Sequence, residues 1–93
     1  MRGIMKVHVA HILVEHAYEA EDLVKMMEQG KSFEALAQKY SKCPSGARGG
    51  DLGLVELSRF DEVFAEAVRP LQPGAMSSIV RTRFGHHLIY RKA

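Results

Sequence analysis

Apolar and polar residues alternate along Lys6–Val14, a segment rich in β-branched side chains, and this pattern predicts a strand. The alternation places four side chains on one face: Val7, Val9, His11 and Leu13. Two segments with apolar residues at helical spacing follow, over residues 18–30 and 32–40. Gly30 is placed to end the first helix and Ser32 to cap the second. The first part of the chain therefore predicts a strand followed by two helices.

The next part of the chain predicts a short strand and a third helix. Residues 51–57 are typical of a strand, and residues 58–68 show helical spacing again. Ser58 is expected to cap this helix, with Asp61 three residues later completing a capping box. The expected apolar stripe of the helix consists of Phe60, Val63, Phe64 and Ala67.

A hairpin is predicted at the end of the chain. Residues 69–74 contain two prolines and a glycine, which break regular structure. Residues 77–82 and 86–92 then flank a short turn as two strands. The order of strand, two helices, strand, helix and two strands indicates an α+β domain, with helices packed on one mostly antiparallel sheet.

Composition indicates one globular domain over residues 1–93. Of the 93 residues, 46% are apolar and 26% charged, and no internal repeat divides them. The single cysteine cannot form an internal disulfide, which favours a reducing compartment. The N-terminal apolar run is short and interrupted by histidine, so we expect neither a signal peptide nor a membrane span. The expected protein is soluble and cytoplasmic, with no membrane partner.

Charge gives little indication of a partner. The net charge is only +2 at pH 7, although basic residues are concentrated near the C-terminus. A nucleic-acid-binding protein usually has a strongly basic face or a recognition motif with exposed aromatics, and the sequence shows neither. We therefore expect no nucleic-acid partner, and we expect a monomer.

Residues 42–53 hold the only cysteine, Cys43, and four of the eight glycines. Glycines cost backbone entropy and bury no side chain, so such a segment is used for its shape. Histidines are paired on the first and last predicted strands, His8 with His11 and His86 with His87. Because side chains alternate across a strand, one histidine of each pair faces a given side of the sheet. A cysteine loop beside two such strands is a candidate polar site.

Four interpretations of this site remain open from the residues alone. Cys43 can be a small buried apolar side chain beside histidines without a chemical role. A zinc site would need three or four ligands, and the spacing shows no known ligand pattern. A cysteine nucleophile would need a base, an orienting partner and an oxyanion hole, and the glycine-rich backbone offers only the last. In a noncovalent site, the same groups would act through hydrogen bonds and electrostatics.

Three segments, taken in order, resemble the parvulin family of peptidyl-prolyl cis/trans isomerases. They are HILV at residues 11–14, FEALAQKYSKCPSGARGGDLG at 33–53 and FGHHLI at 84–89. The likeness spans nearly the whole chain and is strongest to the small bacterial parvulins. It implies an α+β fold with a four-stranded, mostly antiparallel sheet surrounded by helices, in agreement with the element order.

The resemblance also implies the residues of the site. The expected catalytic group consists of His11, Cys43, Thr82 and His87. The expected proline-binding group consists of Leu52, Phe60, Phe64 and Phe84. The remaining histidines, His8, His16 and His86, would lie outside the site. The glycines would let the backbone approach the substrate and would place Cys43 at the pocket floor.

The function implied by the resemblance is acceleration of Xaa–Pro rotation in peptides and in unfolded or partly folded proteins. No covalent bond changes in this reaction, so we expect Cys43 to tune a polar network without acting as a nucleophile, and we expect no cofactor or metal. A binding module or holdase with little turnover is the main alternative. A cysteine-dependent hydrolase or transferase is a third, and it lacks an evident orienting acid.

The chain also departs from the family's usual pattern. Phe60 stands where the family usually has methionine, and Arg69 stands where an apolar residue is more usual and is expected at the surface. Residues 15–23 are acidic where phosphorylation-dependent members have a basic loop, so we expect no dependence on phosphate. Lys42 and Arg48 flank the cysteine loop, either as solvated charges or as groups that favour acidic residues before proline.

Overall fold

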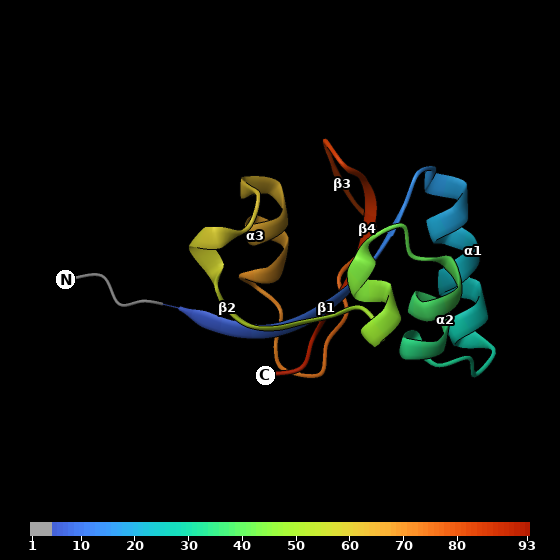
Figure 1. Cartoon of the computed structure of the whole chain (residues 1–93), viewed down its shortest axis with the longest axis horizontal. Coiled ribbons are helices and arrows are strands. Elements are labelled where there is room, and N and C mark those ends of the chain that lie inside the picture. The colour runs from blue at the N-terminus through green and yellow to red at the C-terminus, as the bar shows by residue number, and fades with distance from the viewer. Residues whose placement is uncertain (1–4) are drawn as a thin grey trace.

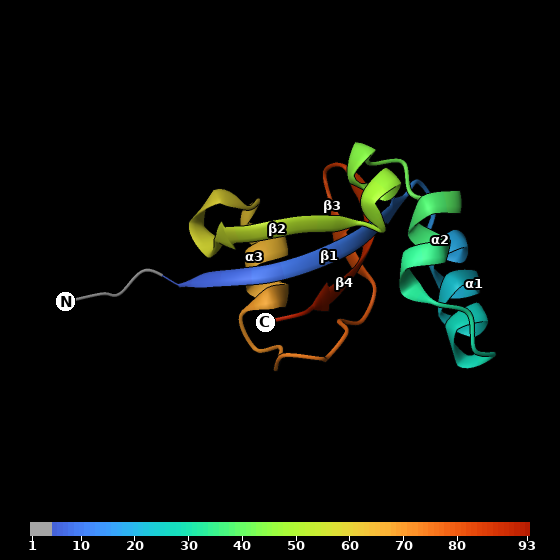
Figure 2. The same ribbon diagram turned by 60° about the horizontal axis from the view of Figure 1, so that its bottom comes forward.

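The computed structural model describes residues 5–93 and shows one sheet with helices on both faces (Figures 1 and 2). Its strands are β1 (Lys6–Val14), β2 (Asp51–Glu56), β3 (Val80–Thr82) and β4 (Gly85–Arg91). They lie in the order β2-β1-β4-β3, and each neighbouring pair is antiparallel. The α+β fold with a four-stranded antiparallel sheet is confirmed.

Five helical segments connect the strands. The α-helices are α1 (Ala17–Glu28), α2 (Phe33–Tyr40) and α3 (Glu62–Val68). The 3₁₀ helices are η1 (Pro44–Arg48) and η2 (Leu57–Arg59). Figure 1 shows α1 and α2 together at one end of the molecule and α3 at the other, with the sheet between them.

Alternation along β1 divides the apolar core into two clusters. Val7 and Val9 pack with α3, in a cluster that also contains Ile89 of β4. Ile12 and Val14 point to the opposite face and pack with the apolar sides of α1 and α2. One strand therefore joins the two clusters, and its α3 face also carries the predicted His11.

The first two helices lie close to their predicted ranges, although α1 begins one residue earlier and ends two residues earlier than expected. The Ser32 hydroxyl accepts a hydrogen bond from the Ala35 backbone N–H at 3.1 Å, which caps α2. Gly30 follows the end of α1 with a φ of 100°, a conformation that costs glycine little.

The predicted start of the third helix is wrong. Residues 57–59 form η2, and α3 begins only at Glu62, with Asp61 as its N-cap. The Asp61 carboxylate accepts a hydrogen bond from the Val63 N–H at 3.0 Å, so Ser58 has no capping role. Because the helix starts later, Phe60 lies outside it and Val63 is exposed. The buried face of α3 consists of Phe64, Ala65 and Val68.

The predicted strand over residues 77–82 is shorter than expected, because β3 contains only Val80–Thr82. The segment before it still contacts β4. The Ser77 N–H donates to the Ile89 carbonyl at 2.7 Å, and the Ser77 hydroxyl accepts from the Ile89 N–H at 3.1 Å. A side-chain oxygen therefore takes the place of a backbone carbonyl, which interrupts the regular ladder.

Within residues 5–93, no helix has the length and apolar character needed to cross a membrane.

Candidate active site

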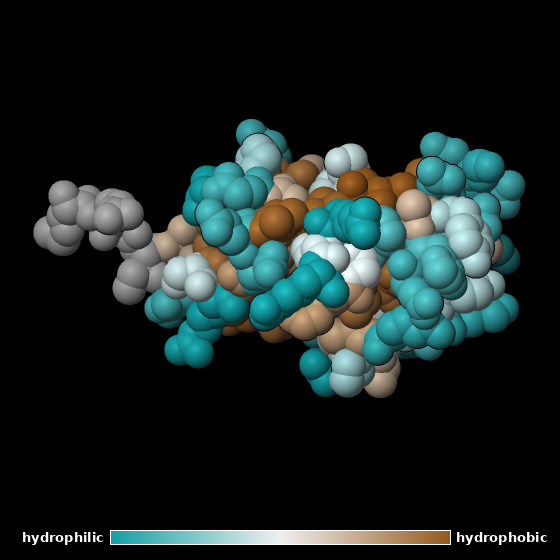
Figure 3. All heavy atoms as spheres, turned by 90° about the horizontal axis from the view of Figure 1, so that it is seen from above, coloured by the Kyte–Doolittle hydropathy of each residue, from teal (hydrophilic) through white to brown (hydrophobic). Residues whose placement is uncertain are grey.

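A cavity of about 520 Å³ opens on the α3 face of the sheet, and all eight predicted site residues line it. The polar group is His11, Cys43, Thr82 and His87, and the apolar group is Leu52, Phe60, Phe64 and Phe84. Seen from above, apolar side chains gather in the middle of the molecule, between hydrophilic groups at the α3 and α1 ends (Figure 3). The structure therefore brings the predicted residues together, and their catalytic roles stay predictions.

The two cavity histidines are positioned by the pairing of β1 with β4. Leu13 pairs with His87 and His11 pairs with Ile89, so the two imidazoles are diagonal neighbours on one face. Their Nδ1 atoms lie 3.0 Å apart, and the rings are stacked with an interplanar angle of 19°. At that separation one Nδ1 carries a proton and donates a hydrogen bond to the other.

Thr82 extends this contact into a chain of hydrogen bonds. Its Oγ1 lies 2.7 Å from His87 Nε2 and accepts a hydrogen bond from the Phe84 backbone N–H at 3.1 Å. The chain therefore runs from the β3–β4 turn through Thr82 and His87 to His11. We call these three side chains the histidine relay.

The relay ends at an unpaired nitrogen. His11 Nε2 is the one buried side-chain nitrogen or oxygen within residues 5–93 that has no hydrogen-bond partner. Such a group carries a free-energy cost unless a partner reaches it. Because this nitrogen is itself buried, a molecule in the cavity would contact it only after the surrounding side chains shift.

Burial keeps both histidines of the relay neutral. Desolvation, with a smaller contribution from the His87 charge, lowers the pKa of His11 to about 4. Desolvation also lowers the pKa of His87, against the opposing effect of the nearby Asp61 carboxylate. The two side chains are only 6% and 3% exposed. At neutral pH the relay therefore presents dipoles and hydrogen bonds to the cavity without a net charge.

Phe64 joins the apolar part of the cavity to the relay. Its ring meets both imidazoles edge-on, with centroids 5.7 Å from His11 and 5.4 Å from His87. On its other side it packs against Phe60, with centroids 4.6 Å apart. Phe64 is 4% exposed, whereas Phe84 is 58% exposed at the cavity wall. The cavity thus has one buried aromatic side chain, Phe64, packed against Phe60, and one aromatic side chain, Phe84, that is open to solvent.

Cys43 lies in the cavity wall, but it is not part of the relay. The hydrogen bond to its Sγ comes from the Ser45 hydroxyl at 3.2 Å, and neither cavity histidine hydrogen-bonds it. Its backbone N–H donates to the Ser41 hydroxyl at 3.3 Å. The turn into η1 thus directs the sulfur toward Ser45, and the part of Cys43 in the polar network stays a prediction.

The glycines beside Cys43 approach the protein's own backbone, which corrects the expectation that they approach the substrate. A Cβ at Gly50 would collide with the His11 carbonyl oxygen, and one at Gly46 would lie 2.8 Å from the Ala37 carbonyl oxygen. The Gly50 carbonyl in turn accepts a hydrogen bond from the His11 N–H at 2.9 Å. These glycines let the cysteine loop pack directly on α2 and on β1 at His11.

The other histidines lie outside the cavity wall, as expected. His8 Nε2 contacts the Asp51 carboxylate at 2.8 Å, which links β1 to β2. His86 Nδ1 lies 3.1 Å from the Glu15 carbonyl oxygen, and His16 stacks on Tyr18. Within residues 5–93, no group of three or more His, Cys, Asp or Glu side chains is placed to hold a metal ion.

Sequence reasoning missed several residues of the cavity wall. Leu13, Arg59, Asp61 and Arg83 line it, and Ser45 holds the cysteine sulfur. Leu13 was predictable, because it shares a face of β1 with His11. Arg59 and Asp61 lie before α3, which starts later than its pattern suggests, and the only signal of that shift is that Asp61 can cap a helix as well as Ser58 can.

Together, the fold and the site define a small α+β domain in which an aromatic cavity is backed by two neutral, hydrogen-bonded histidines. The chain matches the Rotamase family model, described as the PPIC-type PPIASE domain, over residues 11–93. It therefore belongs to this family of parvulin-type peptidyl-prolyl cis/trans isomerase domains.

Individual relatives agree with this assignment. The foldase protein PrsA of Bacillus subtilis is 39% identical over 85 residues, covering 90% of this chain and 29% of PrsA. A probable parvulin-type peptidyl-prolyl cis-trans isomerase of Bordetella bronchiseptica is 44% identical over 90 residues, covering 94% of this chain and 35% of that protein. The solution structure of NmPin, the parvulin of Nitrosopumilus maritimus, superposes with a TM-score of 0.84 at 29% identity, over 100% of both chains.

The chain thus spans about a third, or less, of the curated relatives named above, and the whole of NmPin.

Proposed function

We propose that this domain catalyses cis/trans isomerisation of Xaa–Pro bonds in peptides and in unfolded or partly folded proteins. The observation that carries the proposal is the junction at Phe64, where an aromatic cavity meets the histidine relay. Family membership and the full-length match to NmPin support it.

The cavity is suited to the chemistry of the amide bond. Resonance makes the planar amide polar and gives it a rotational barrier of roughly 20 kcal/mol. When the bond twists, charge separation between oxygen and nitrogen decreases, so a dry apolar wall disfavours the planar form relative to the twisted one. Leu52, Phe60 and Phe64 supply such a wall for a prolyl ring. A reduction of about 4 kcal/mol in the barrier would suffice for a thousandfold acceleration.

The relay supplies a fixed polar boundary beside that wall. Thr82 and His87 hold the His11 ring in place, so its unpaired Nε2 keeps one orientation. Because that nitrogen is buried, the relay acts on a bound peptide through its fixed dipoles and needs no direct hydrogen bond at Nε2. None of these steps needs a nucleophile, and Cys43, held by Ser45, is assigned a packing and polar role.

The test is the cis-to-trans relaxation of short Xaa–Pro peptides in the presence of the parent protein and of Phe64→Ala. We expect acceleration by the parent and its loss in the variant, because the variant removes the ring that joins the cavity to the relay. Since Phe64 is also a core residue, the fold of the variant is checked by circular dichroism, and Phe60→Ala provides a second, less buried opening of the cavity.

The same experiment separates catalysis from holding. Tight peptide binding by the parent without acceleration would favour a holdase, and the proposed isomerase would then be wrong. The name chaperone belongs to relatives such as SurA of Burkholderia pseudomallei, of which this chain spans 21%.

The domain is further proposed to act without phosphate. Glu15 and Glu19, at the start of α1, make the segment after β1 acidic. Matched phosphorylated and unphosphorylated Ser–Pro peptides test this, and a strong preference for the phosphorylated peptide would contradict it.

We also propose a cellular setting. A single cysteine suits a reducing, cytoplasmic compartment, and the modest net charge suits a protein without a nucleic-acid partner. A monomer without a membrane partner is proposed as well. Cell fractionation and light scattering on the purified chain test the location and the oligomeric state.

A further inference from the structure

The wall of the cavity carries more positive than negative charge. Lys42, Arg59 and Arg83 line it together with one carboxylate, Asp61. The histidines add no charge at neutral pH, because burial lowers the pKa of both. An apolar cavity for a prolyl ring is therefore bordered by a positive rim, which we define as these three cations.

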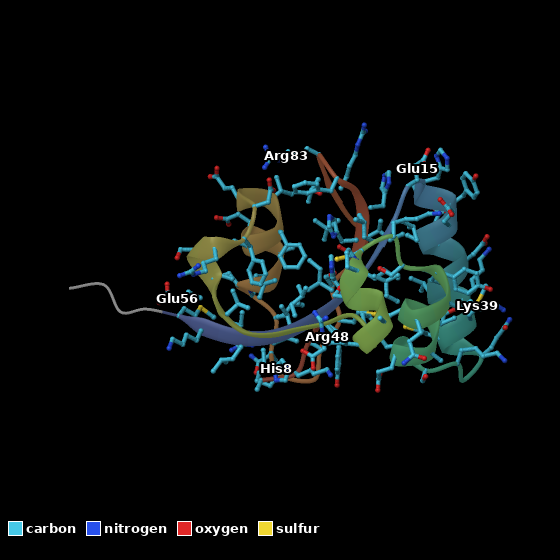
Figure 4. The ribbon with its side chains drawn as sticks, viewed as in Figure 1. His8, Glu15, Lys39, Arg48, Glu56 and Arg83 are labelled. Carbon is cyan, nitrogen blue, oxygen red and sulfur yellow. The ribbon has the colours of Figure 1, made fainter. Side chains whose placement is uncertain are left out.

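Two of the three cations are available to a ligand. The Arg83 guanidinium lies 4.9 Å from the Phe84 ring, and its Nε is 4.0 Å from the Asp61 carboxylate. Figure 4 shows Arg83 extending from the β3–β4 turn on the α3 side. By contrast, neither Lys42 nor Arg59 forms an ion pair with any carboxylate of the described part of the chain. The carboxylate of the cavity, Asp61, thus faces Arg83 and also accepts the Val63 N–H that caps α3.

The two available cations come from separate segments on the wall. Lys42 precedes Cys43 in the link between α2 and η1, and its backbone N–H donates to the Leu13 carbonyl at 2.7 Å. Arg59 ends η2, directly before Phe60 of the cavity wall. A peptide whose proline occupies the cavity therefore passes these charges with the residues on either side of the proline.

We infer that the enzyme prefers Xaa–Pro bonds flanked by an acidic side chain, aspartate or glutamate, and that Lys42 and Arg59 select it. This inference rests on the proposed isomerase function and adds a substrate class to it. Exposed charges act over a screened distance of about 10 Å in 0.1 M salt, so the selection operates through encounter and binding. Arg48, the other cation near the cysteine, is absent from the cavity wall and takes no part.

The experiment compares isomerisation of peptides that carry glutamate, glutamine or lysine directly before proline, and of a second series with the same residues directly after it. Glutamine matches glutamate in shape without its charge. For the parent we expect kcat/KM to be about five- to tenfold higher for glutamate than for glutamine in at least one series, and lowest for lysine. The ratio should shrink toward one at about 0.5 M salt.

Variants assign the effect to named residues. In the double variant Lys42→Gln, Arg59→Gln the glutamate-to-glutamine ratio should fall to near one, and this ratio is the readout. Arg81→Gln is the matched control, because Arg81 is exposed on β3 and lies outside the cavity wall. It removes one positive charge and should keep the parent's ratio.

The remaining outcomes would contradict the acidic preference, its assignment to Lys42 and Arg59, or the proposed function itself. If the parent accelerates all peptides of both series equally, the acidic preference is wrong, while the proposed isomerase function is unaffected. A ratio that Arg81→Gln lowers as much as the double variant would overturn the assignment to Lys42 and Arg59. A phosphoserine peptide several-fold faster than its glutamate counterpart would replace the carboxylate with phosphate as the selected group. No acceleration of any peptide would overturn the proposed function and this inference with it.

Discussion

His11, His87 and Thr82 show how single side chains set the character of the site. Two imidazoles within 3.0 Å of one another would repel strongly if both were charged, and burial prevents this by lowering the pKa of each. The Thr82 hydroxyl fixes the far side of His87 at 2.7 Å. The histidine relay is consequently neutral at neutral pH, and the charge of the cavity comes from the side chains at its rim.

Replacing Thr82 tests whether the relay orients His11. Thr82→Val keeps the shape but leaves His87 Nε2 and the Phe84 N–H without partners, so we expect a loss of about 1–3 kcal/mol in the free energy of unfolding. We expect kcat/KM to fall about tenfold as the imidazole pair loses its fixed orientation. Thr82→Ser retains the hydroxyl and should keep most of both. Equal activity of the valine and serine variants would show that the relay does not matter for turnover.

The pH dependence of stability follows mainly from the lowered pKa of His11, and the lowered pKa of His87 adds to it in the same direction. The pKa of His11 is about 4 in the folded protein and near 6.5 in the unfolded chain, so the unfolded state binds the proton first as pH falls. The stabilisation is complete above about pH 6.5 and is lost as pH falls toward 4, by about 2 kcal/mol between pH 7.5 and 4.5.

Urea unfolding at several pH values measures this loss. The pKa of Asp51 is also lowered, chiefly by the Gly53 N–H, but its contribution falls away only below its ordinary value of 3.8. A free energy of unfolding that stays constant from about pH 7 to 4.5 would contradict a buried, neutral His11.

At the scale of elements, the cysteine loop is fixed by direct contact with β1. The His11 N–H donates to the Gly50 carbonyl, and Gly50 has a φ of 84°. A side chain at Gly50 has no space beside the His11 carbonyl. The same contact therefore places η1, Cys43 and one histidine of the relay relative to each other.

Gly50→Ala should be strongly destabilising for this reason. The added methyl group must push η1 away from β1 and also adopts an unfavourable positive φ, so we expect a loss of about 2–4 kcal/mol in the free energy of unfolding. Gly74→Ala is the matched control, since Gly74 has a φ of 90° with nothing within 4 Å of its Cβ position. It should cost only about 1 kcal/mol. Similar losses in the two variants would show that close packing at Gly50 is unimportant.

At the scale of the whole molecule, the sheet separates two apolar clusters, and the cavity lies on the side of the smaller helix, α3. The α1–α2 cluster contributes no residue to the cavity wall. It instead fixes the second face of β1 and β4, the strands that carry His11 and His87. The α1–α2 side of the domain thus holds in place the two strands whose histidines face the cavity on the α3 side.

The sequence predicted the strands and the first two helices, because alternation along β1 and helical spacing are local properties. The residues of the cavity came from the family resemblance, since no local pattern brings distant segments together. The sequence could not predict that α3 begins at Glu62, since Ser58 and Asp61 offer competing caps and the packing of Leu57 decides between them. Nor could it predict the partner of Cys43, because the direction of one sulfur depends on the turn into η1. Of the charges on the cavity wall, Lys42 was recognised beside the cysteine loop, whereas Arg59 and Asp61 depend on the unexpected start of α3.

The most direct test of the account is the exchange rate between cis and trans forms of an Xaa–Pro peptide at equilibrium, measured by NMR magnetisation transfer with Cys43→Ala. A noncovalent mechanism predicts that the variant keeps substantial catalysis, within about tenfold of the parent, because the aromatic cavity and the histidine relay are intact. Complete loss of exchange in the variant, together with a covalent peptide adduct on the parent's thiol, would contradict the account.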